Sequence, residues 1–230
     1  MEIYEYIKRN YESLTAEITD ISARVGVSAP RLVAVTKSGT DEELIALVRA
    51  GAYAIGENRP SELVRRARLL RQMGFDPEMH QIGTLQSNKA KLVAPVASLI
   101  HSLDSESLLR ELSRRAEQLS VDIPVLIEIN CAEEPQKSGV MPADAEAFLL
   151  RTLEFPRLKP RGLMTMGPVS DSPEQLRPYF RATKNLFDKL NTRYGFGESP
   201  VLSMGMSDSY RVAIEEGSTL VRVGRRLFIK

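Results

Sequence analysis

The 230-residue sequence is poor in cysteine and histidine and has no long apolar run. Its one cysteine, Cys131, cannot form a disulfide within the chain, so we expect a reducing compartment, the cytoplasm. Its two histidines, His80 and His101, lack the clustered cysteines or acidic residues of a metal site. No stretch approaches the roughly 20 apolar residues that cross a bilayer, and the N-terminal residues do not resemble a signal peptide.

The charges are nearly balanced, with a net charge of +1, and the basic residues are spread along the chain. This distribution gives no reason to expect binding to nucleic acid or to an anionic membrane. The hydrophobic share of 43% is typical of a globular protein.

Short apolar or β-branched runs alternate with stretches of helical spacing along the chain. This pattern predicts a parallel sheet with helices packed on it. Eight units without a dinucleotide-binding motif favour an α/β fold, a single closed (β/α)8 barrel domain over residues 1–230, with an open sheet as the alternative. An extra helix within residues 1–26 is expected to cover the outside or bottom of the barrel. The runs are Leu32–Val35, Ala52–Ile55, Met79–Ile82, Ser98–Leu103, Pro124–Ile129, Arg161–Met166, Val201–Met206 and Leu220–Val223.

Lys37 follows the first run, at the end of a strand where barrels of this kind carry their active sites. Strand alternation places it on one face with Val33 and Val35. If that face points inward, Lys37 is an amine at the barrel mouth that can condense with a carbonyl group. The alternative is a lysine that simply extends into solvent. Lys137, in a later loop, is the second candidate for a reactive amine.

The last run alternates in the same way, so that Arg222 and Gly224 share one face. A buried arginine needs a hydrogen-bond acceptor because it keeps its proton. Glycine at position 224 lets a ligand approach the backbone, although a simple turn glycine is the alternative.

The segment Gly205–Asp208 leads into a helix predicted over residues 208–216, whose free N–H groups could hold an anion. The loops after strands seven and eight of a barrel commonly bind phosphate. An amine, a phosphate-binding loop and a buried cation at one mouth are the parts of a pyridoxal 5′-phosphate site.

Eight segments in this order and spacing resemble the pyridoxal phosphate homeostasis proteins, the YggS-type, alanine-racemase-like family. The resemblance extends from about Leu32 to Phe228. It implies an alanine-racemase-type barrel. The matching segments are Leu32–Lys37, Gly56–Asn58, His80–Lys89, Ile100–Asp104, Lys137–Gly139, Gly162–Met166, Leu202–Asp208 and Gly217–Gly224.

The resemblance also implies the roles of particular residues. Lys37 would carry the cofactor as a Schiff base, and Arg222 would face the pyridine nitrogen. Asn58 and Met204 would line the cofactor.

Ser207 and the backbone at Gly224 and Arg225 would bind the phosphate group, as the resemblance implies. The chain departs from the family pattern at Ser209, where an acidic residue is usual. It departs also in the loop after Asn58 and in its last four residues. None of these departures touches Lys37, Arg222 or Gly224.

The implied function is to bind and buffer pyridoxal 5′-phosphate in vitamin B6 homeostasis, as a monomer, with apo-enzymes that need this cofactor as clients. The rival is a racemase or Schiff-base lyase that uses the cofactor. A racemase needs a base on each face of the substrate. Alanine racemases take the second base from a C-terminal β-domain, for which no residues follow Lys230 here. We therefore expect no efficient turnover. A barrel that binds a sugar phosphate non-covalently is a third alternative.

Overall fold

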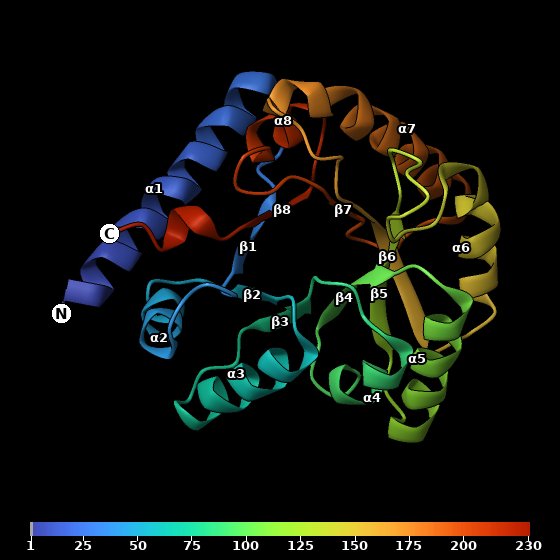
Figure 1. The fold of residues 1–230 in the computed structure, drawn as a ribbon, viewed down its shortest axis with the longest axis horizontal. Helices are drawn as coiled ribbons and strands as arrows, with labels where there is room; N and C mark the ends of the chain where they lie inside the picture. Colours follow the sequence, from blue (N-terminus) through green and yellow to red (C-terminus); the bar gives the residue numbers. More distant parts are fainter. Residues whose placement is uncertain (1) are drawn as a thin grey trace.

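The structure, a computed structural model, describes residues 2–230. Parallel strands follow one another around a closed barrel, and β1 pairs with β8 to complete it (Figure 1). The predicted closed barrel is therefore confirmed, and the open sheet is excluded. The strands are β1 (Arg31–Val35), β2 (Ala54–Glu57), β3 (Glu78–Gln81), β4 (Leu99–Leu103), β5 (Ile123–Ile129), β6 (Leu158–Thr165), β7 (Val201–Ser203) and β8 (Leu220–Val223).

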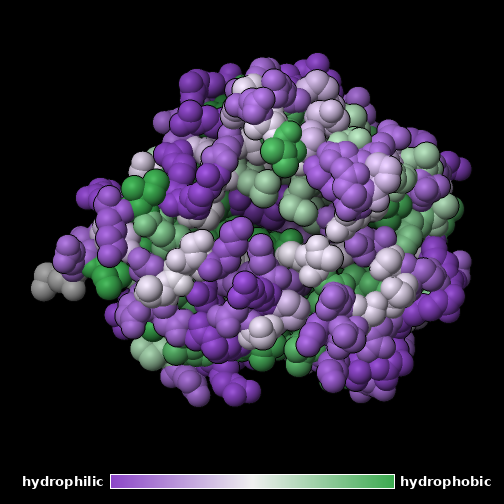
Figure 2. Space-filling model, in the orientation of Figure 1, coloured by the Kyte–Doolittle hydropathy of each residue, from purple (hydrophilic) through white to green (hydrophobic). Residues whose placement is uncertain are grey.

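Helices surround the barrel, and most of them lie between consecutive strands (Figure 1). Within residues 2–230, none of them is long and apolar enough to cross a membrane. The face of the molecule in Figure 2 is largely hydrophilic, with hydrophobic residues in small separate groups. The helices are α1 (Glu2–Val25), α2 (Asp41–Arg49), α3 (Pro60–Gln72), α4 (Ala90–Val93), α5 (Glu106–Leu119), α6 (Ala145–Leu153), α7 (Arg177–Tyr194) and α8 (Tyr210–Glu215).

The barrel wall separates two layers of apolar packing, one between the strands and the helices and one inside the barrel. Ala34 and Val221 belong to the layer between the barrel wall and the helices. Val33 and Val35 pack with Leu126 inside the barrel. Because side chains alternate along a strand, the residues that follow Val35 on the inner face reach the mouth.

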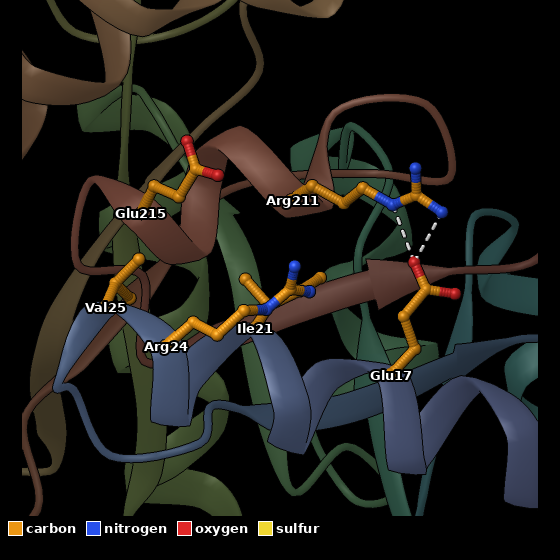
Figure 3. A pocket seen from close by; sticks show the side chains of 6 residues that line it. All are labelled: Glu17, Ile21, Arg24, Val25, Arg211 and Glu215. Carbon is orange, nitrogen blue, oxygen red and sulfur yellow. Dashed lines mark hydrogen bonds and ion pairs between the residues drawn. The ribbon is translucent and has the colours of Figure 1, made fainter.

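Helix α1 packs on the outside of the barrel against α2 and α8. Its Glu17 accepts hydrogen bonds from Tyr210 and Arg211 on α8 and from Arg226 near the C-terminus. Figure 3 shows Arg211 turned toward Glu17 across a groove of about 480 Å³ between α1 and α8. Asn10 donates to the carbonyl of Ile229, at 2.7 Å, so α1 also holds the end of the chain.

Two strand boundaries differ from the sequence prediction by three residues. Strand β7 ends at Ser203, three residues before the predicted end, because Gly205 turns the chain with φ at +91°. Strand β6 begins earlier than predicted, at Leu158, and its register against β5 shifts between Val125 and Leu126.

Gly162 lies at this shift, opposite Leu126, and its φ is +143°. A Cβ atom there would lie 1.9 Å from the carbonyl oxygen of Val201 on β7. We expect Gly162→Ala to lower the free energy of unfolding by about 3 kcal/mol or more, because backbone strain adds to a clash with backbone. Gly74→Ala is the control, since Gly74 also has a positive φ but open space around it, and about 1 kcal/mol is expected there. Urea unfolding measures the free energy of unfolding of both variants. Equal losses in the two would contradict the role of the close contact with Val201.

Candidate functional site

A cavity of about 880 Å³ opens at the C-terminal ends of the strands. Residues that follow β1, β2, β3, β6 and β7 line it, together with the end of β8. This is the end of the barrel at which the sequence predicted a site. Because the strands are parallel and closed, residues far apart in the chain meet here.

The cavity brings together all but one of the predicted cofactor-binding residues. The exception is Met204, which does not line it. Met204 is fully buried in the cluster that also contains Phe180 of α7 and Ala213 of α8. Its neighbour Ser203 points into the barrel, so Met204 faces outward by strand alternation. The residues that do line the cavity are Lys37, Asn58, Ser207, Arg222, Gly224 and Arg225.

Lys37 stands at the rim of the cavity with an exposed side chain. The second candidate amine, Lys137, does not line this cavity and forms a salt bridge of 2.7 Å with Glu134. Of the two, Lys37 is the amine that faces the space where a ligand would bind.

The backbone before Lys37 is held by a buried ion pair that the sequence did not reveal. Arg66 of α3 pairs with Glu57 at the end of β2, and both side chains are almost completely buried. Arg66 also donates to the carbonyls of Thr36 and Gly39, on either side of Lys37. Because breaking a buried pair leaves an uncompensated charge, Arg66 is held in place by Glu57. Its hydrogen bonds to the two carbonyls then fix the turn that carries Lys37.

Ser207 lies where two backbone N–H groups converge. Its Oγ accepts from the amide of Gly224 at 3.2 Å and from the amide of Arg225 at 3.3 Å. A Cβ atom on Gly224 would lie 2.8 Å from the carbonyl oxygen of Val35, so the close approach requires glycine. The helix predicted over about residues 208–216 is α8, which begins two residues later than predicted, at Tyr210. The groups that could bind an anion here are therefore loop amides and a hydroxyl rather than a helix terminus.

Arg222 crosses the interior of the barrel below the cavity. Its guanidinium donates to the carbonyl of Ser203 at 2.9 Å and to the carbonyl of Thr165 at 3.0 Å. It also donates to the Ser203 hydroxyl. Burial lowers the pKa of Arg222 to about 10, against the opposing effect of Glu128, so the side chain stays charged near neutral pH.

Glu128 on β5 is a buried carboxyl group near this arginine. Its side chain is 2% exposed, and its Oε2 has no hydrogen-bond partner among the described residues. Burial and, to a smaller extent, the charge of Asp104 raise the pKa of Glu128 to about 7, although the charge of Arg222 lowers it. A carboxylate in the apolar run Ile123–Ile129 was a visible signal in the sequence, which our sequence analysis did not use.

The comparisons with known proteins agree with this fold. Residues 10–229 match the family model described as "Alanine racemase, N-terminal domain". A pyridoxal phosphate homeostasis protein of Aquifex aeolicus is 40% identical over 203 residues, which cover 88% of each chain. The chain belongs to the alanine racemase N-terminal domain family and, within it, to the pyridoxal phosphate homeostasis proteins.

Solved structures show the same barrel. A protein of Bifidobacterium adolescentis superposes with a TM-score of 0.91 at 33% identity and covers 99% of this chain and 96% of its own. PipY of Synechococcus elongatus, solved with pyridoxal phosphate bound, has a TM-score of 0.84 at 28% identity. That alignment covers 97% of this chain and all of PipY.

The raised pKa of Glu128 makes stability depend on pH. A carboxyl group whose pKa is higher in the folded state binds its proton more tightly there, so its destabilising effect is absent below about pH 4.5 and complete above about pH 7. We expect Glu128→Gln to gain about 3 kcal/mol relative to the wild type between these pH values.

Urea unfolding at several pH values measures this difference, and Glu198→Gln, at an exposed position, is the control that should follow the wild type. A difference between Glu128→Gln and the wild type that stays constant with pH would show that Glu128 titrates as in the unfolded chain.

Proposed function

We propose that this chain binds pyridoxal 5′-phosphate at the barrel mouth, covalently bonded to the amine of Lys37, and that it acts in vitamin B6 homeostasis. The observation that carries the proposal is the convergence of three groups on one cavity. They are the exposed amine of Lys37, the amides that meet at Ser207, and the buried guanidinium of Arg222. The relatives named for this cofactor and the structure of PipY with it support the proposal.

The loop at Ser207 fits a phosphate group. The amides of Gly224 and Arg225 already point to a single oxygen atom, the Ser207 Oγ. A phosphate oxygen is a stronger acceptor than a hydroxyl because it carries charge. The Ser207 hydroxyl can turn to donate to the same group. The side chain of Arg225 pairs with Asp208 at the surface, so we assign the binding to its backbone.

Arg222 fits the nitrogen of a pyridine ring. An arginine donates hydrogen bonds and accepts none, so its partner nitrogen must be unprotonated. When bound, the cofactor supplies an aldehyde that condenses with primary amines, and its ring withdraws electrons best when protonated. Arg222 therefore favours holding the cofactor over using it for turnover.

Lys37 is placed to take up and release the cofactor. Its side chain is exposed at the rim, so a cofactor bonded there remains in contact with solvent at one edge. Asn58 and Thr84 line the same rim and can donate hydrogen bonds. We infer that apo-enzymes that need pyridoxal 5′-phosphate are the clients to which the cofactor passes.

Borohydride reduction tests the role of Lys37. The protein incubated with pyridoxal 5′-phosphate should turn yellow, and reduction should fix the cofactor on the peptide that contains Lys37. Lys37→Ala should abolish both the colour and the label. Lys89→Ala, which removes an exposed lysine outside the cavity lining, is the control and should keep both. Peptide mass spectrometry identifies the site, and a label on Lys137 would overturn the assignment.

Ser207→Ala tests the phosphate-binding loop. Loss of one hydrogen bond to a charged group should weaken binding of pyridoxal 5′-phosphate by about 0.5–3 kcal/mol. Gly224→Val should weaken it more, because its side chain would meet the backbone of Val35. Ser199→Ala, at an exposed serine, is the control. Titration followed by absorbance gives the affinities, and the wild type should bind pyridoxal without its phosphate much more weakly. Equal affinity for the two compounds would refute the assignment of phosphate binding to this loop.

A further inference from the structure

A row of hydrogen-bonded side chains crosses the barrel interior from its lower end to Arg222. His80 Nε2 lies 3.1 Å from the Glu78 carboxylate, and His80 Nδ1 lies 2.9 Å from His101 Nε2. His101 Nδ1 lies 3.0 Å from the Ser203 hydroxyl, which accepts from Arg222. All but Glu78 are buried, at 3% exposure or less. The row joins β3, β4, β7 and β8.

The chemistry of the two ends sets the direction of every hydrogen bond in the row. Arg222 can only donate, and an ionised Glu78 can only accept. Hydrogen bonds from His80 lower the pKa of Glu78 against the effect of burial, and Arg31 lowers it further, so Glu78 is ionised. Burial lowers the pKa of His80 and lowers that of His101 further, so both rings are neutral.

With neutral rings, one arrangement satisfies every contact. Arg222 donates to Ser203, Ser203 donates to Nδ1 of His101, and His101 donates through Nε2–H to Nδ1 of His80. His80 then donates through Nε2–H to Glu78. If the proton of either ring moved to its other nitrogen, two acceptors or two donors would face each other. An unmatched buried polar group costs more free energy than a hydrogen bond contributes.

We propose that Ser203 and His101 are positioning residues that hold the Arg222 guanidinium in one orientation toward the cavity. The proposal rests on the proposed function, because a fixed Arg222 matters to the cofactor only where the pyridine nitrogen meets it. The Ser203 hydroxyl connects Arg222 to the histidines, because it accepts a hydrogen bond from Arg222 and donates one to His101. The sequence offered no role for the two histidines beyond the lack of metal-site neighbours, and here they form part of the support of the site.

The first experiment uses the ligand-free protein, whose two histidines give only two imidazole spectra. Nitrogen NMR on labelled histidine should show both rings neutral and protonated at Nε2 near pH 7. Ser203→Ala should shift the Nδ1 signal of His101, which loses its donor, and Ser203→Thr should restore it. Ser218→Ala is the matched control, because Ser218 is an equally buried serine that bonds only to backbone carbonyls. A charged or Nδ1-protonated His101 would overturn the proposal.

The second experiment uses the complex with pyridoxal 5′-phosphate. Ser203→Ala should weaken binding about tenfold to a hundredfold, the range for a hydrogen bond to a charged group. It should also shift the visible absorption maximum of the bound cofactor, which a loss of stability alone would not do. Ser218→Ala should leave both unchanged.

The outcomes separate the two proposals. If Ser203→Ala changes neither the affinity nor the absorption while Lys37 still takes the borohydride label, the positioning role is wrong and the proposed function stands. If the wild type takes no label on Lys37, the proposed function fails. The histidine spectra then decide by themselves whether Ser203 and His101 hold Arg222 as argued.

Discussion

The pairing of β1 with β8 is the contact on which the site depends. Val33 lies opposite Arg222 in this register, so the segment that carries Lys37 and the segment that carries Gly224 leave the barrel side by side. The carbonyl of Val35 lies so close to Gly224 that no side chain fits between them. Closure of the sheet therefore brings together the amine, the guanidinium and the amides that meet at Ser207.

Buried polar groups lie both inside the barrel and between its wall and the helices, and they fall into two kinds. The pair of Glu57 and Arg66 and the row that ends at Arg222 are satisfied by one another. Such networks hold a unique arrangement, because each member loses its partner if the arrangement changes. Glu128 differs, since its Oε2 has no partner among the described residues, and its ionisation opposes folding.

The fold was predictable because it repeats. Each of the eight predicted runs overlaps a strand of the barrel, and alternation correctly put Val33 and Val35 inside. The cavity residues near strand ends followed from the rule that parallel strands end at one mouth. The predictions were less accurate where the chain departs from regular strand geometry. Gly205 ends β7 early, and Met204 belongs to the outer layer rather than to the cavity. The hydrogen bonds of Arg66 were not predictable, because its partners lie in two separate segments of the chain, the turn after β1 and the end of β2.

Closure by β8 has a consequence for how the protein forms. Strand β8 follows β1 by about 185 residues, so their pairing is a contact of very high sequence separation, which forms slowly because a long loop must close first. During synthesis, β1 to β7 leave the ribosome before their closing partner exists, and two strand edges stay open until then. A ligand that touches both the β1 and the β8 segments binds only the closed state. Its free concentration would therefore shift the equilibrium between open and closed barrels, and the vitamin supply of the cell would act on the folding of the chain itself.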